Sequence, residues 1–233
     1  MSRWPSELTT RAWHARWRAR LRTWRNPSGL CLAPSVDTAL SPLGVPLHDE
    51  ALLQWRRWCE AHEGRHVRLG LSARWLLSTA LSPAGQGGAG REQAQADAVS
   101  RWSHFLGLDE AAWQARWVTR AVHLPQGVLV CAVPRALVDD VLAVAAHHHV
   151  TVQWLGPWWA QDLNQWLTAG GATASRRTVR MREPAWAVHV QAQGAHVTQL
   201  WGEPDGDEAG AVDESPWKAQ MLVGDATAWK AEA

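Results

Sequence analysis

Residues 128–147 read VLVCAVPRALVDDVLAVAAH, a short apolar run followed by an amphipathic segment. The run Val128–Val133 has the continuous apolar character of a strand that is covered on both faces. The segment Arg135–His147 has helical spacing, and we expect one side of this helix to carry Leu137, Val138, Val141 and Leu142. A strand that leads directly into a helix is the repeating unit of α/β architectures, so this stretch predicts that class of fold.

The sequence on both sides continues the alternation of strands and helices. Before it, we expect strands at His66–Ser72 and Trp75–Ser82 and a helix at Arg91–Leu106. The core-facing residues of that helix are predicted to be Ala98, Val99, Trp102, Phe105 and Leu106. After it, we expect a strand at Val150–Leu155 and a helix at Pro157–Leu167, with the proline in the first helical turn.

The two ends of this core carry further elements. Gly29–Ala33 is predicted to be a strand that turns at Pro34-Ser35 and returns at Val36–Leu40. His48–His62 has helical periodicity, with apolar positions at Leu52, Leu53, Trp55, Trp58 and Cys59. Two alternating segments, Ala185–Gln191 and Ala195–Trp201, predict a hairpin.

Composition limits the class of protein. With 233 residues, 46% of them hydrophobic, and a net charge of +1, the chain can bury a core and is not a general polyanion binder. It has no apolar run long enough for a membrane span and no secretory signal pattern. The cysteines Cys31, Cys59 and Cys131 are odd in number and far apart, which indicates reduced cytosolic thiols.

Aromatic usage is heavily skewed, with 18 Trp, one Phe and no Tyr. A GC-rich genome explains most of this skew, because tryptophan then fills the aromatic positions of the core. A stacking platform for bases or sugars is the alternative.

Opposite charges gather at the two ends of the chain. Residues 1–25 hold seven arginines and one acid, whereas residues 203–233 hold eight acids and two lysines. We expect a basic amphipathic helix at 1–28 and an acidic, mostly disordered tail at 202–233. The residues of the helix expected to contact a membrane or a partner are Arg16, Trp17, Arg18, Arg20, Leu21, Arg22 and Trp24.

Three interpretations of the basic helix stay open. Its apolar stripe, formed by Trp13, Trp17, Leu21 and Trp24, suits an interfacial helix whose arginines meet anionic head groups. The same stripe could pack on the domain or on a partner protein. Binding of nucleic-acid phosphates is the third interpretation, and it is disfavoured because only one short segment is basic.

Five segments carry a resemblance to a known family. In order, they are HVRLGLSARWLLSTALSP (66–83), RWSHFLG (101–107), WQARWVTRAV (113–122), GVLVCAVPRALVDDVL (127–142) and VQWLGPWWAQDLNQWL (152–167). Together they resemble the actin-like proteins of bacterial inner-membrane assembly platforms, namely the PilM-like pilus proteins and the cytoplasmic domain of the L protein (GspL) of type II secretion. The resemblance covers about residues 29–170.

The resemblance implies an α/β fold of actin-like (ribonuclease H-like) type, a mixed sheet with flanking helices. We assign this domain to residues 29–201, with an incomplete second half. The family also implies a scaffolding role at the cytoplasmic face of the inner membrane, with platform proteins of a type IV pilus or type II secretion system as partners.

Actin-like proteins that bind ATP carry an Asp and glycines on their first hairpin, because phosphates need close backbone N–H groups and a Mg²⁺-positioning carboxylate. In the corresponding segment of this chain, Cys31 stands at the carboxylate position and Ala33-Pro34 replaces the glycine. The chain after Leu167 is also too short for a full second half. We therefore expect a member that binds no ATP and no other cofactor.

Four other motifs have weak chemical signals. Gly85-x-Gly87-x-x-Gly90 matches a dinucleotide fingerprint, but Ser82-Pro83 separates it from the strand, so a flexible loop is the simpler interpretation. His147-His148-His149 lacks further metal ligands and suits a helix C-terminus. Catalysis by Cys131 as a nucleophile, with His123 as its base, is disfavoured because a thiol in a buried strand is inert. Asp139-Asp140 suits a polar helix face.

The sequence thus favours a non-catalytic scaffold, cytoplasmic and peripheral to the inner membrane, with no catalytic, cofactor or metal residues. Two alternatives remain: a nucleotide- or dinucleotide-binding enzyme that uses Gly85–Gly90, and a nucleic-acid-binding protein that uses the arginine-rich helix.

Overall fold

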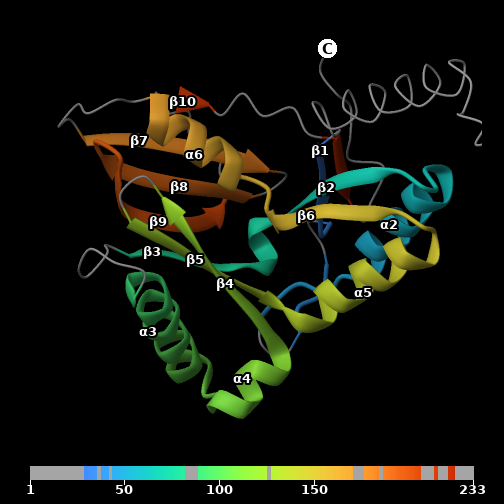
Figure 1. Ribbon diagram of the computed structural model, residues 1–233, viewed down its shortest axis with the longest axis horizontal. Coiled ribbons are helices and arrows are strands. Elements are labelled where there is room, and N and C mark those ends of the chain that lie inside the picture. The colour runs from blue at the N-terminus through green and yellow to red at the C-terminus, as the bar shows by residue number, and fades with distance from the viewer. Residues whose placement is uncertain are drawn as a thin grey trace, which may run out of the picture.

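The computed structural model describes residues 29–35, 38–41, 44–81, 89–124, 127–169, 176–183, 186–205, 213–214 and 220–223. These residues form three sheets with helices packed on them (Figure 1). The predicted basic helix at 1–28, with all seven of its expected contact residues, lies outside the described residues. The mixed parallel and antiparallel sheets with flanking helices confirm the predicted α/β class.

The first sheet is parallel throughout and has the order β11-β1-β2-β6. Its strands are β1 (Gly29–Ala33), β2 (His66–Leu71), β6 (Thr151–Pro157) and β11 (Gln220–Val223). Two helices, α2 (Asp49–Ala61) and α5 (Arg135–His147), cover one face. Alternate residues of the inner strands point into that layer, so Leu30 and Leu32 pack with Val67 and Leu69 against the helices.

The predictions for this layer are largely confirmed. β1 and α5 have the predicted bounds, and α2 lies within one residue of them at each end. The predicted apolar faces need two corrections. Leu53 and Leu142 are 51% and 43% exposed, because each helix buries a narrower stripe than its sequence suggests. The buried positions of the two helices are Ala51, Trp55 and Cys59 in α2 and Leu137, Val141 and Ala145 in α5.

The predicted return strand at Val36–Leu40 is wrong. β1 has β2 on one side and β11 on the other, so no edge of β1 is left for a returning strand. In the described part of that segment, Leu40 makes an isolated bridge to Pro46 and is 61% exposed.

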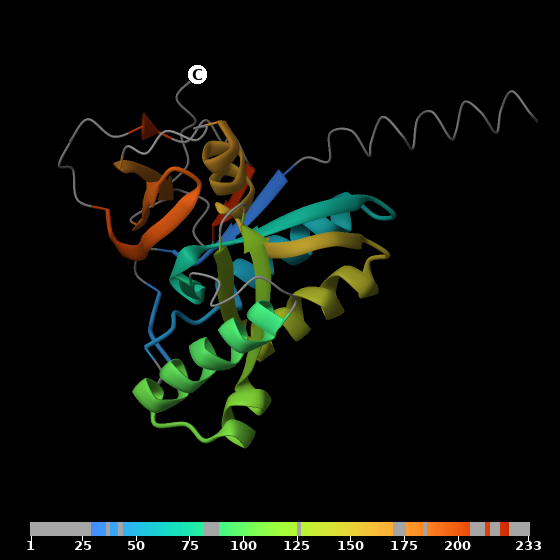
Figure 2. The same ribbon diagram turned by 60° about the vertical axis from the view of Figure 1, so that its left-hand side comes forward.

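The second sheet is antiparallel, with the order β3-β5-β4. It consists of β3 (Leu77–Leu81), β4 (Trp117–Leu124) and β5 (Gly127–Pro134), and it carries helices α3 (Ala89–Leu106) and α4 (Glu110–Arg116). Figure 2 shows α3 lying across this sheet. As predicted, β5 is central and deeply buried.

Two predictions for this unit need correction. Trp75 belongs to the 3-10 helix η1 (Ala73–Trp75) and not to β3, because Ser72 caps this turn by accepting a hydrogen bond from the Arg74 backbone N–H at 3.1 Å. Phe105, predicted to face the core, is 85% exposed. In the last turn of α3, Leu106 packs toward Trp113 of α4, and the Phe105 side chain is left exposed to solvent.

The third sheet has the order β10-β7-β8-β9. Its strands are β7 (Arg176–Glu183), β8 (Trp186–Gln193), β9 (His196–Pro204) and β10 (Asp213–Glu214), and helix α6 (Ala160–Ala169) packs on it. The predicted hairpin corresponds to β8 and β9. The helix predicted at Pro157–Leu167 starts three residues late, because Pro157 still pairs with Leu71 as the last residue of β6.

The C-terminal region is tied to the domain by the described residues of three strands, of which β10 pairs in parallel with β7. β9 runs on to Pro204, past the boundary that we assigned at residue 201. Farther on, β11 lies beside β1 in parallel register, with Cys31 opposite Met221. The described parts of the acidic tail therefore include strand residues.

Candidate functional site

The carboxyl edge of the parallel sheet is where an α/β fold of this kind would bind a ligand. β1, β2 and β6 all end there, and each is followed by a tight local segment. These segments are Pro34-Ser35, the Ser72–Trp75 turn and Trp158-Trp159. In this chain the edge is filled by protein side chains.

Two tryptophans close one side of the edge. Trp158 and Trp159 are 4% and 0% exposed. Trp158 follows β6 and lies directly over β2, where its backbone N–H donates to the Leu71 carbonyl at 3.2 Å. A Cβ added to Gly70 would lie 2.6 Å from the Trp158 Cβ and 2.8 Å from its Cα. Only glycine therefore allows this close approach, and the space above β2 is occupied.

A buried carboxyl group lies at the same edge. Glu183, the last residue of β7, is 5% exposed and accepts a hydrogen bond from the Ser72 hydroxyl at 2.8 Å. Burial raises the pKa of Glu183 to about 7. Hydrogen bonds from Ser72, the Ala73 backbone and Trp158, together with the positive charge of Arg74, oppose this rise in the pKa without cancelling it.

Arg74 ties the loops of this edge together. Its guanidinium Nη1 donates to the Ser35 carbonyl at 2.8 Å, so η1 and the segment after β1 are joined. The Glu183 charge raises the pKa of Arg74, but desolvation by burial is the larger effect and lowers it. The guanidinium that could have met an anionic ligand is thus used in a contact within the protein.

Cys31 lies in β1, the strand whose sequence predicts no Mg²⁺-positioning carboxylate. It is fully buried, in the cluster that contains Leu129, Trp158 and Trp159. Burial, and then the nearby charge of Glu183, raise the pKa of the Cys31 thiol well above its ordinary value. An uncharged thiol at this position offers no ligand for Mg²⁺.

The glycine motif does not have the context of a dinucleotide fingerprint. Gly85 and Gly87 lie outside the described residues, and Gly90 is the second residue of α3. The strand before the motif, β3, pairs antiparallel with β5, whereas the fingerprint belongs to a parallel βαβ unit.

The remaining sequence candidates occupy separate places. The histidines lie at the end of α5, where His149 has a φ of 55° and His148 Nε2 is 4.0 Å from Glu60 Oε1. Burial raises the pKa of the Cys131 thiol to about 12, which keeps it protonated. Asp139 and Asp140 are exposed on α5, as predicted, and Asp140 contacts His48 Nε2 at 3.0 Å. Among the described residues, no group of three His, Cys, Asp or Glu could hold a metal ion.

A groove lies between α3, α4 and β4. It has a volume of about 910 Å³ and is lined mainly by these three elements. Trp113 and Trp117 form its apolar floor, with ring centroids 5.4 Å apart and nearly parallel planes. Among the described residues, β4 pairs with β5 alone, so its other edge is unpaired along the groove. An unpaired edge beside an apolar floor can bind an extended peptide.

Two polar groups of residues that line the groove lack a hydrogen-bond partner in the described part of the chain. The Trp117 indole N–H and the Ser103 hydroxyl are buried and have no hydrogen-bond partner among the described residues. Both signs of charge border the groove, from Glu92, Glu110, Arg120 and Arg135. Arg135 also fixes the groove wall, because its Nη2 donates to the Gln114 carbonyl at 2.9 Å.

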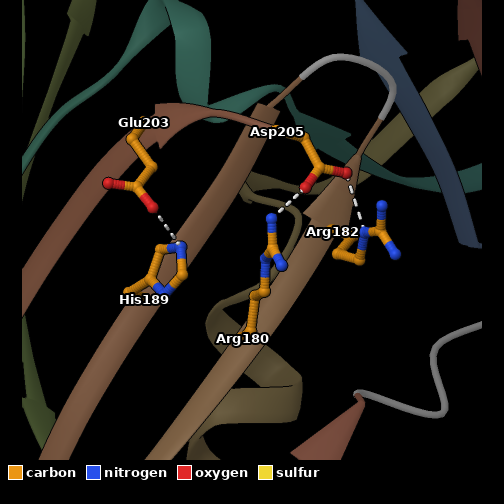
Figure 3. A network of polar contacts seen from close by, with 5 residues as sticks. All are labelled: Arg180, Arg182, His189, Glu203 and Asp205. Atoms are coloured by element: carbon orange, nitrogen blue, oxygen red, sulfur yellow. Dashed lines mark hydrogen bonds and ion pairs between the residues drawn. The ribbon is translucent and has the colours of Figure 1, made fainter. Parts of the chain in front are cut away.

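The outer face of the third sheet holds a second polar cluster (Figure 3). Asp205, which follows β9, accepts hydrogen bonds from Arg180 and from Arg182 Nε, the latter at 2.7 Å. Next to it, His189 Nε2 lies 3.0 Å from Glu203 Oε1. These pairs bind the end of β9 back across the sheet to β7 and so serve packing.

Sequence reasoning missed the groove and Glu183. β7 had a usable signal, because Val179 and Met181 alternate with arginines in RRTVRMRE, as expected for a half-buried strand. Glu183 itself has no local signal, since its burial results from a contact between segments 111 residues apart.

Comparison with known proteins found similarity in solved structures alone. No protein-family model and no curated protein matches the sequence. One similar structure is a Bacteroides thetaiotaomicron protein with an actin-like ATPase fold and unknown function (TM-score 0.39, 5% identity, 60% of this chain and 48% of that chain). Another is the cytoplasmic domain of EpsL, an inner-membrane component of the type II secretion system of Vibrio cholerae (TM-score 0.43, 13% identity, 83% and 81%).

The third is the PilM–PilN type IV pilus biogenesis complex (TM-score 0.43, 14% identity, 70% of this chain and 51% of that chain). The chain spans about half the length of the first and third of these proteins.

Proposed function

We propose that this chain is a non-catalytic scaffold on the cytoplasmic face of an inner-membrane assembly platform of the type IV pilus or type II secretion kind. The observation that carries the proposal is the filled carboxyl edge of the parallel sheet. A phosphate group there would have to displace Trp158 and approach the carboxyl group of Glu183. Binding of partners, rather than nucleotide chemistry, is then the function of the domain.

The groove between α3, α4 and β4 is the docking position in this proposal. Its occupant is an extended segment of an inner-membrane platform protein that adds a strand to the free edge of β4. Carbonyls of such a segment would accept hydrogen bonds from the Trp117 indole and the Ser103 hydroxyl, which lack partners among the described residues. Apolar side chains of the segment would pack on Trp113.

The arginine-rich segment would hold the domain near the membrane. No helix in the described part of the chain is long and apolar enough to cross a bilayer. We propose that Arg16, Arg18, Arg20 and Arg22 bind anionic head groups, with Trp17, Leu21 and Trp24 at the acyl boundary. Vesicles of anionic lipid should then retain the full chain in flotation, and replacing the four arginines by Glu should release it. Equal retention of both proteins would contradict this part.

The docking proposal is tested by site-specific photocross-linking in the native cell. A photoreactive residue replaces Arg120, which is exposed on β4, and in a matched control it replaces Thr198, exposed on β9. We expect a covalent product with a pilus or secretion inner-membrane protein from position 120 and none from position 198. The absence of a platform protein from the products at position 120 would contradict the proposal.

A further inference from the structure

Phe105 is an outlier among the aromatic side chains. It is the chain's single phenylalanine and is 85% exposed. By contrast, every tryptophan whose side chain the structure describes is buried or half-buried. Single exposed hydrophobic residues are common on protein surfaces. A fully projecting ring therefore indicates a contact outside the monomer only together with a receptor that fits it.

A small aromatic pocket lies one helical turn away from Phe105. It has a volume of about 230 Å³ and lies where η1 and β3 meet β8 and β9. Four tryptophans contribute to its walls, Trp102, Trp159, Trp186 and Trp201, and no charged residue lines it. Pockets for drug-sized ligands measure about 300–1,000 Å³, so this one suits a single side chain.

The position of the ring relative to the pocket defines the geometry of an assembly. Trp102 lines the pocket, and Phe105 follows it by three residues on α3, so both lie on neighbouring positions of one helix. Because Trp102 is part of the pocket wall and Phe105 lies one turn farther along the same helix, two copies related by a twofold axis can exchange ring and pocket reciprocally.

We propose that Phe105 of one copy inserts into the tryptophan pocket of a second copy, and the reverse, to form a symmetric dimer. Charges beside the two features are complementary. Arg101 is exposed on α3, one turn before Phe105. Glu203, which pairs with His189 within the monomer and whose side chain is half exposed, directly follows the pocket residue Gly202. The proposed contact is one ring and one pocket from each copy, so we expect a weak dimer.

This inference does not depend on the proposed scaffold function. A weak dimer could form whether or not the β4 groove binds a platform protein, because Phe105 does not line the groove.

The single phenylalanine makes the test specific. Biosynthetic incorporation of 4-fluorophenylalanine into the full chain gives one ¹⁹F NMR resonance, which reports on position 105 alone. We expect this resonance to shift with protein concentration and to lose its solvent isotope effect as the ring enters the pocket. In parallel, sedimentation should show a monomer–dimer equilibrium. A resonance that stays solvent-exposed at every concentration, or a protein that stays monomeric, overturns the proposal.

Variants locate the contact. Phe105→Ala should weaken the dimer about tenfold or more, because the dimer loses the aromatic ring from each of its two pockets. It should have little effect on folding, since the side chain is exposed in the monomer. The matched control is Val122→Ala, at another exposed apolar residue of the same unit, and should leave the equilibrium unchanged. A photoreactive phenylalanine at position 105 should cross-link to Leu200–Gly202 of the second copy. A cross-link elsewhere would overturn the assignment of the pocket.

Discussion

Glu183 should make the stability of this protein depend on pH in an unusual direction. Its pKa in the folded chain is about 7, whereas an unperturbed glutamate titrates near 4.5. Folding therefore favours the protonated carboxyl group, because burial removes the ionised form from water. The stabilisation is fully present below the unfolded pKa, near 4.5, and is lost as the pH rises through 7.

The magnitude follows from the difference between the two pKa values. A shift of about 2.5 pH units corresponds to about 3 kcal/mol of unfolding free energy between pH 4.5 and pH 8. Glu183→Gln keeps a side-chain oxygen that can accept the Ser72 hydrogen bond, and its amide group cannot ionise. The variant should be closest to the wild type at the lowest pH and should exceed its stability increasingly as the pH rises to 8.

The assay is urea unfolding at several pH values between 5 and 8, with the variant and the wild type measured together. Glu63→Gln, at an exposed residue in the turn after α2, is the matched control and should follow the wild-type curve. If the difference between Glu183→Gln and the wild type does not change with pH, Glu183 does not titrate in a buried site and the reasoning is refuted.

Three further predictions concern the packing of the domain. Gly70→Ala should lower the unfolding free energy by about 1–3 kcal/mol in urea unfolding, because the new methyl group would meet the Trp158 backbone. A variant as stable as the wild type would show that the edge is not filled. Trp55→Phe should cost about 1 kcal/mol in the same assay, since it removes the 3.0 Å hydrogen bond to the Val141 carbonyl, and Trp58→Phe, in the same helix, should cost less. A chain that ends at Asp205 lacks β11, the neighbour of β1. Hydrogen exchange of the β1 amides should therefore accelerate, while exchange of the β6 amides should stay constant. Unchanged protection of the β1 amides would argue against the β1–β11 pairing.

Local patterns predicted individual elements well. The apolar residues of Arg135–His147 recur at helical spacing, and this spacing predicts the helix. β5 was recognised because a central strand is apolar on both faces. Such signals depend on neighbouring residues alone, so the sequence contains them in readable form.

The errors concern contacts between distant segments. The partner of β1 on one edge is β11, about 190 residues away, and no local pattern in GLCLA distinguishes that arrangement from a hairpin. Phe105 has the right helical position for burial, but α4 changes what the last turn of α3 meets. Glu183 became a site residue only because β7 ends beside Ser72.

We propose that the carboxyl edge of the parallel sheet is closed to nucleotides. A calorimetric titration of the full-length protein with ATP and Mg²⁺ tests this directly. We expect no saturable binding, because Trp158, Arg74 and Glu183 already fill the edge and contact one another or the adjoining loops. Stoichiometric, saturable binding of Mg·ATP would contradict it.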